Sequence, residues 1–144
     1  MMPFFTCPAY FIAGHAVGAT CFYLFHRFVF HGKLGRWKLF KGAAMIHALH
    51  HAYPDKTKFY HFPMWAVLVI GLVTSLVSLL SLPFGIGLMS FYALYARQHR
   101  RAHFGPPSLW AEHHRDHHRL HPKSNYSGVY PFIDRIFGTN VTHG

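Results

Sequence analysis

The chain has 144 residues, of which 51% are hydrophobic and only 12% are charged, and it carries a formal net charge of +10. One domain is expected at this length, and the low charge content argues against an ordinary soluble domain, in which about 25% of residues are charged. The basic residues lie in two blocks, Arg27–Lys58 and Arg97–Arg135, that each adjoin an apolar stretch, so membrane orientation and anionic headgroups explain them better than nucleic-acid binding does.

The first predicted element is a membrane-spanning helix from residue 8 to about residue 27. This stretch has no acidic or basic residue before its end, and about 20 apolar residues of helix cross a hydrocarbon core. It lacks the basic start of a secretory signal and runs into a pair of histidines, which favours a retained span. Cys7 and Cys21 have no CxxC spacing and are expected to be small buried hydrophobes, and His15 is expected to have a packing role.

A polar block follows from residue 31 to residue 61. Glycines loosen its start, and the stretch Lys41–Ala52 then predicts a short helix. Pro54 and Asp55 are expected to end that helix, because proline cannot continue a helix and aspartate favours turns.

An apolar hairpin is predicted next, within an uncharged stretch that is long enough for two crossings. Residues 62–81 form the most apolar span. The Pro83–Gly87 segment is a turn signal, and residues 84–103 return toward the basic side as a third span. Arginines near the end of this span have side chains long enough to reach the membrane interface.

The second polar block runs from residue 104 to residue 144. Its start, Gly105–Pro107, is a helix break, and residues 108–120 predict a second short helix. The chain then passes through turn residues into a short apolar run, Val129–Phe137.

Ten of the fifteen histidines form four clusters within or beside these polar blocks. The clusters are an H-x4-H (His26, His31), an H-x2-HH (His47, His50, His51), an H-x3-H (His99, His103) and a second H-x2-HH (His114, His117, His118). Residues three and four apart share a helix face, so each H-x2-HH box is expected to point toward one common centre. His26 and His31 are about 140° apart on an ideal helix. They require a helix end or bend between them, or each must address a different ion.

The number of histidines predicts two metal ions, because ten imidazoles exceed the roughly four ligands of one tetrahedral site. Imidazole binds iron, zinc, copper and nickel, so the ligand type does not choose the metal. Iron is the expected metal if the site activates dioxygen, with zinc as the alternative in purified protein. The boxes meet only if both polar blocks lie on one side of the membrane, so the chain must turn back near Pro83. The basic residues predict that this side is cytosolic.

Other polar residues near the last box have two open interpretations each. His113 and His121 are either additional ligands or residues that support ligands. Glu112 and Asp116 either accept the second N–H of a metal-bound histidine or are exposed helix charges. Asp134 is expected to pair with a nearby arginine, and no chemistry is assigned to it.

These segments resemble the fatty acid hydroxylase and sterol desaturase superfamily, from about His26 to Thr139. The resemblance is carried by HRFVFHG, HALHHAYPDKTKF, the H-x3-H pair and HRDHHRLHPKSNYSGVYPFIDRIFGT, and it looks strongest to the fatty acid 2-hydroxylases. It implies an all-α integral membrane helical bundle with a cytosolic, histidine-rich cap of short helices. It also implies metal-ligand roles for the ten clustered histidines, and two electrons from a separate donor such as a cytochrome b5 or a ferredoxin-like protein.

The sequence therefore predicts a membrane-bound lipid hydroxylase of one domain, residues 1–144. It would insert one oxygen atom of O2 into a fatty acyl C–H bond at a di-iron centre, with no catalytic residue beyond the metal ligands. The alternatives are a desaturase or a carotenoid or sterol hydroxylase with the same centre, or a non-enzymatic metal-binding membrane protein. Relatives usually have two spans before the first box where this chain has room for one, so a homodimer is an expected way to complete the bundle. The expected membrane is the endoplasmic reticulum in a eukaryote and the inner membrane in a bacterium.

Overall fold

The structure is a computed structural model that describes residues 6–54, 64–106 and 108–141, and every regular element in these residues is a helix. The elements in chain order are α1 (Thr6–Phe25), the π-helix η1 (His26–Phe30), the 3-10 helix η2 (Lys33–Arg36), α2 (Lys38–Ala52), α3 (Met64–Leu80), α4 (Leu82–Phe104), α5 (Leu109–Arg119) and α6 (Pro131–Ile136). The predicted all-α class is confirmed.

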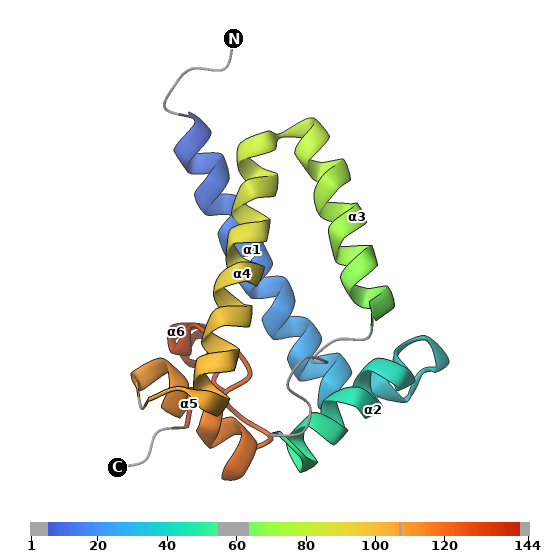
Figure 1. The fold of residues 1–144 in the computed structure, drawn as a ribbon, viewed down its shortest axis with the longest axis vertical. Coiled ribbons are helices and arrows are strands. Elements are labelled where there is room, and N and C mark those ends of the chain that lie inside the picture. Colours follow the sequence, from blue (N-terminus) through green and yellow to red (C-terminus); the bar gives the residue numbers. More distant parts are fainter. Residues whose placement is uncertain (1–5, 55–63, 107, 142–144) are drawn as a thin grey trace.

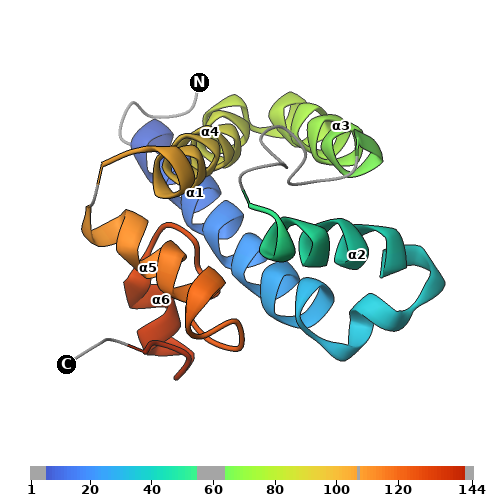
Figure 2. The ribbon, with the colours of Figure 1, turned by 60° about the horizontal axis from the view of Figure 1, so that its bottom comes forward.

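The long helices and the short helices occupy different ends of the molecule. The helices α1, α3 and α4 run along the long axis, and the short helices gather at one end (Figure 1). Seen from that end, α2 lies on one side of α1, and α5 and α6 lie on the other (Figure 2). The two polar blocks therefore meet on one side of the apolar hairpin, as predicted.

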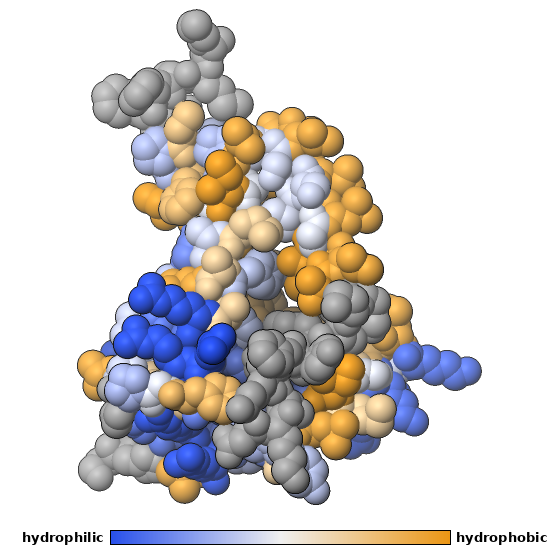
Figure 3. Space-filling model, viewed as in Figure 1, coloured by the Kyte–Doolittle hydropathy of each residue, from blue (hydrophilic) through white to orange (hydrophobic). Residues whose placement is uncertain are grey.

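Exposed hydrophobic side chains cover much of the long-helix region. Leu72, Leu79 and Leu80 of α3 are more than half exposed, and hydrophobic residues gather over this part of the surface, whereas hydrophilic ones gather at the short-helix end (Figure 3). An apolar surface of this extent is typical of contact with lipid or another protein. Among the described residues, one helix, Cys7–Phe30, has both the length and the apolar composition to cross a membrane; the apolar helix Val67–Leu80 is shorter.

The turn of the hairpin lies slightly earlier than the sequence indicated. The helix α3 ends at Leu80 and α4 begins at Leu82, so the turn is at Ser81 and the prediction of a turn at Pro83–Gly87 is wrong by a few residues. Proline is tolerated in the first turn of a helix, where its missing N–H has no partner to lose. Pro83 therefore lies in the first turn of α4 instead of interrupting the helix.

The glycines of this segment serve helix packing. A Cβ atom on Gly87 would collide with the backbone carbonyl of Phe11, and one on Gly14 would collide with the carbonyl of Phe84. Without side chains at these positions, the backbones of α1 and α4 approach closely, as small residues permit in membrane helices. This crossing holds α1, which leads directly into His26, against α4, which carries His99.

The core below the crossing is aromatic and extends to the second polar block. Phe22 and Tyr23 of α1, Phe91 and Tyr95 of α4, and Val129 are all buried there. His15 joins the same elements, because its Nδ1 lies 2.7 Å from the Ser90 hydroxyl and its Nε2 lies 2.6 Å from the Tyr130 hydroxyl. The predicted packing role of His15 is confirmed. Cys7 and Cys21 are exposed, so the prediction that they are buried is wrong.

The short helices agree closely with their predictions. The helix α2 begins at Lys38, three residues before the predicted start, and ends at Ala52 as predicted; Asp55 lies outside the described residues, as does the start of the predicted second span. The helix α5 covers Leu109–Arg119, and the Ser108 side chain accepts a hydrogen bond from the Ala111 amide at 3.3 Å. Serine is a favoured residue at this capping position.

Candidate metal centre

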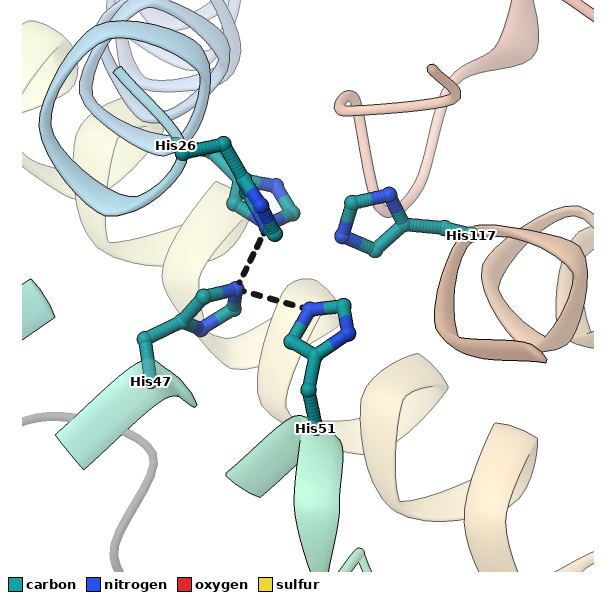
Figure 4. Close-up of side chains that lie close together, drawn as sticks. His26, His47, His51 and His117 are labelled. Carbon is teal, nitrogen blue, oxygen red and sulfur yellow. Dashed lines mark hydrogen bonds between the residues drawn. The ribbon is translucent and has the colours of Figure 1, made fainter. Parts of the chain in front are cut away.

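All ten clustered histidines come together at the short-helix end, where they form two groups of five. The first group is His26, His31, His47, His51 and His117; the second group is His50, His99, His103, His114 and His118. Within each group, one ring nitrogen per residue lies within 4.8 Å of every other. Four of these side chains are seen pointing toward a common centre in Figure 4.

Each H-x2-HH box is divided between the two groups. His47 and His51 of α2 belong to the first group and His50 to the second, whereas His114 and His118 of α5 belong to the second and His117 to the first. The prediction that each box addresses one centre is therefore wrong. Residues four apart on a helix differ by about 40° in direction, but adjacent residues differ by about 100°, so i and i+4 stay together and the residue between them turns to the other group.

The H-x4-H pair reaches one group because the backbone there is a π-helix. The His31 amide donates to the His26 carbonyl at 3.1 Å, which is the i to i+5 hydrogen bond of that helix type. This winding brings residues five apart onto one face, so both side chains join the first group. The expected helix end between them is present, because η1 ends at Phe30, and the two side chains lie in one group rather than in two.

The first group has the spacing of ligands around one ion. The Nε2 atom of His47 lies 3.1 Å from that of His26, 2.9 Å from that of His31 and 3.0 Å from that of His51. A neutral imidazole nitrogen either donates one hydrogen bond or accepts through one lone pair, so His47 cannot satisfy all three neighbours. Two imidazole nitrogens bound to one ion at about 2.1 Å and at right angles lie about 3.0 Å apart. A cation at the centre would satisfy the whole set.

The second group contains buried nitrogens that lack hydrogen bonds. Both ring nitrogens of His114 and of His118 are buried with no partner in the described part of the chain. In the same group, the Nε2 atoms of His50 and His99 lie 3.0 Å apart. A buried polar atom without a partner costs about 1–3 kcal/mol, and an ion would remove this cost for the one nitrogen of each ring that binds it. The residues of both groups thus fit a metal ion bound through imidazole.

The two groups adjoin each other. The ring of His51, from the first group, stacks on the ring of His118, from the second, with centroids 4.0 Å apart and an angle of 10° between the planes. Both α2 and α5 contribute to both groups, so neither centre can form without these two helices. The arrangement is that of a paired site rather than of two independent ones.

The electrostatics of the site favour neutral imidazoles. Burial lowers the pKa of His31 and His51 to about 4. Burial, together with neighbouring imidazoles, also lowers the pKa of His47, His114 and His117. Histidine binds a metal through its neutral form, so at neutral pH these side chains are already in the state that a ligand requires.

Two rings of the first group contact backbone carbonyls through their Nδ1 atoms. The Nδ1 atom of His26 lies 2.6 Å from the Tyr126 carbonyl oxygen, and that of His117 lies 2.6 Å from the Ser124 carbonyl oxygen. Residue types alone could not indicate these contacts, because any residue can supply a carbonyl. The one signal in the sequence was the family resemblance of the segment HRDHHRLHPKSNYSGVYPFIDRIFGT, which contains Ser124 and Tyr126.

The acidic residues near the site differ in their roles. Glu112 is exposed and pairs with Arg115 at 2.7 Å, which agrees with its interpretation as a surface charge. Asp134 is fully buried and pairs with His113 at 2.9 Å, so its predicted pairing with an arginine is wrong. Burial alone would raise the pKa of this carboxyl, but hydrogen bonds from His113 and from its other neighbours hold it below the ordinary value. Asp116, His113 and His121 lie outside both groups.

The fold and the site define a helical protein with a paired, buried histidine centre suited to two metal ions. The family model for fatty acid hydroxylases matches residues 11–139. The chain therefore belongs to the fatty acid hydroxylase family, and the predicted resemblance is confirmed.

Two similar proteins are known by name. The chain is 34% identical over 148 residues to the fatty acid 2-hydroxylase of Homo sapiens and 32% identical over 149 residues to that of Macaca fascicularis. These alignments cover 92% and 93% of this chain but 39% and 40% of the relatives. The chain thus spans about two fifths of the length of the curated relatives it matches. No solved structure matches the chain.

Proposed function

We propose that this protein is a membrane-bound lipid hydroxylase that converts a fatty acyl C–H bond, at carbon 2, into C–OH. The observation that carries the proposal is the pair of adjoining histidine groups, with five convergent imidazoles each, in a member of the fatty acid hydroxylase family. The choice of carbon 2 follows from the names of the two relatives.

The ten histidines are the proposed ligands of two iron ions, five for each. Iron bound there would supply the reductive activation of O2, which a protein side chain cannot perform. One oxygen atom enters the C–H bond, and the other leaves as water with two protons and two electrons. Zinc is the alternative metal in purified protein, because imidazole also binds zinc.

The protein's own contribution is position and the exclusion of water. His26, His99, His114 and His117 are buried almost completely, so few water molecules reach the centre. Such exclusion protects reactive intermediates from side reactions. The proposed reaction requires no nucleophilic side chain.

We place the histidine groups at the cytosolic face of a single domain, residues 1–144. Residues 8–27, 62–81 and 84–103 are the proposed spans, and they would guide an acyl chain toward the end where the groups lie. The cytosolic orientation rests on the basic residues of the two polar blocks. The proposed membrane is the endoplasmic reticulum or the bacterial inner membrane, and a homodimer would supply further helices to the bundle.

The lining of a small cavity supports the proposal that electrons come from an external donor. The cavity has a volume of about 80 Å³ and is lined by His51, His103 and His118 from the two groups and by Arg115 and Arg119. Its basic lining would attract an acidic protein surface. A cytochrome b5 or a ferredoxin-like protein is the proposed donor.

The test is lipid analysis of cells that express the protein, compared with cells expressing His99→Ala or His117→Ala. We expect 2-hydroxy fatty acids from the wild type only, because each substitution removes a ligand from one group. A new double bond in place of a hydroxyl would assign a desaturase. Metal binding without any oxidised lipid, in the presence of O2 and a reductant, would assign a metal-binding protein.

A further inference from the structure

The buried carboxylate of Asp134 is the centre of a hydrogen-bond network that the family assignment does not explain. Its relative exposure is 0%. The Tyr126 amide donates to Oδ1 at 2.7 Å and the Ser127 amide donates to Oδ2 at 2.9 Å. The Thr139 hydroxyl donates to Oδ1 at 2.8 Å, and the His113 ring N–H donates to Oδ2 at 2.9 Å. One carboxylate therefore holds the 126–127 backbone against α5 and against the C-terminal segment.

The C-terminal segment holds the same loop from its other side. Asn125 is fully buried and has a positive φ of 56°, which asparagine adopts more readily than most residues. Its side chain accepts from the Val141 amide at 2.8 Å and donates to the Val141 carbonyl at 3.0 Å. The backbone amide of Asn125 donates to the Thr139 carbonyl at 2.8 Å. We call Asn125, Asp134 and Thr139 the Asp134 network.

The loop fixed by this network carries both carbonyls that contact the first histidine group. The Tyr126 carbonyl accepts from His26, and the Ser124 carbonyl accepts from His117. A carbonyl oxygen only accepts, so Nδ1 of each ring carries the proton. In the neutral ring, the lone pair then lies on Nε2, which is the atom that faces the group. The loop thereby sets both the tautomer and the direction of two of the five imidazoles.

The second group does not share this support to the same extent. His114 and His118 belong to it, and neither ring nitrogen of either residue has a hydrogen-bond partner in the described part of the chain. The Ser124 and Tyr126 carbonyls both accept from rings of the first group. Loss of the network should therefore disturb the first group and leave the second group in place.

We infer that Asp134 is a positioning residue for the first histidine group, and that the two ions depend on it unequally. The inference rests on the proposed function, since it requires that the groups bind metal. Partners of the second ring nitrogen of a metal-bound histidine typically change metal affinity by about 10–100-fold. We expect Asp134→Asn to lower the affinity for the ion of the first group by a factor in that range. The affinity for the ion of the second group should be unchanged.

The experiment is anaerobic titration of the whole purified chain with Fe²⁺, with bound iron per chain as the readout. Wild type should bind two ions tightly and Asp134→Asn one. Glu112→Gln is the matched control, because Glu112 is an exposed carboxylate on α5, outside both groups, and it should bind two. Thr139→Ser and Thr139→Val form a second pair, because serine keeps the hydroxyl and valine removes it. Only the valine variant should lose affinity for the iron ion of the first group. If Asp134→Asn does not fold, this pair tests whether the Asp134 network positions that group.

Combined substitutions identify which ion is affected. Asp134→Asn with His117→Ala should bind one ion, as Asp134→Asn alone does, because both changes act on the first group. Asp134→Asn with His99→Ala should bind none. A purely structural role would instead weaken both ions in parallel, and this result, or two tight ions in Asp134→Asn, overturns the inference. Wild-type protein that binds no iron would overturn the proposed function itself, so the two failures are distinguishable.

Discussion

The two histidine groups are built by different means, although they contain the same number of residues. The second group takes two pairs at i and i+4, His99 with His103 and His114 with His118, from the regular helices α4 and α5. The first group depends on a π-helix for His26 and His31 and on a loop about a hundred residues later for the carbonyls that orient two of its rings. Helix geometry alone arranges most of the second group, whereas the first requires a local irregularity and a long-range contact.

The largest expected effect separates two neighbours on one helix. His47→Ala should remove the first ion and His50→Ala the second, because these residues belong to different groups. Either variant should lose hydroxylation, since the proposed reaction requires both ions. Bound metal per chain and lipid product are the measurements. If His47→Ala released both ions while His50→Ala released one, the division into two groups would be wrong.

A substitution at the helix crossing should affect both groups alike. Gly87→Ala places a Cβ atom against the backbone of Phe11, and overpacking of this kind costs about 1–3 kcal/mol. We expect a lower midpoint of thermal unfolding in detergent. Gly71→Ala in α3 is the matched control, because a Cβ atom there meets nothing within 4 Å. Equal stability of the two variants would contradict the close approach of α1 and α4.

Arg115 should act on the second group as Asp134 acts on the first. Its guanidinium donates to the Ala102 carbonyl at 2.6 Å and to the Gly105 carbonyl at 2.7 Å, and so it ties the end of α4 to α5. Arg115→Met should weaken the second ion, by a factor that we expect to be smaller than for a lost ligand. Iron titration in the His117→Ala background, where only the second ion remains, isolates this effect. Unchanged affinity in that background would show that the helices need no such tie.

The smallest expected effect is a gain in stability with neither group disturbed. Gly42 lies in α2, and a Cβ atom added there would meet nothing within 4 Å. Alanine is more favourable than glycine within a helix by about 0.5–1 kcal/mol. Gly42→Ala should therefore raise the unfolding midpoint slightly and leave bound iron at the wild-type level. Loss of iron in this variant would indicate that α2 needs flexibility at Gly42 to bring His47 and His50 to their groups.

The sequence was sufficient to predict which ten histidines come together and on which side of the hairpin they meet. Spacing of three and four residues identified the boxes, and their need to meet required the chain to turn back. The sequence could not predict that each H-x2-HH box is divided between two groups. Which histidine faces which group depends on how α2 and α5 are placed in the fold. The π-helix at His26 could not be predicted from the local sequence either. Its i to i+5 winding depends on packing, and no sequence pattern marks it.

The support of the first group was the least predictable feature. Carboxylates beside the last box, Glu112 and Asp116, were considered either as partners of the ligand rings or as exposed helix charges, because side chains are visible in a sequence and backbone carbonyls are not. Asp134 acts one step further away, through the loop that carries those carbonyls. Only the folded structure brings residues this far apart in the chain into one network.

The most direct test of the central claim is bound iron and oxygen incorporation measured on the same anaerobically purified sample. With isotopically labelled O2, a reductant and a fatty acyl substrate, we predict two iron ions per chain and one labelled oxygen atom at carbon 2 of the product. A single ion per chain, or a hydroxyl group that carries no label, would contradict a two-iron hydroxylase.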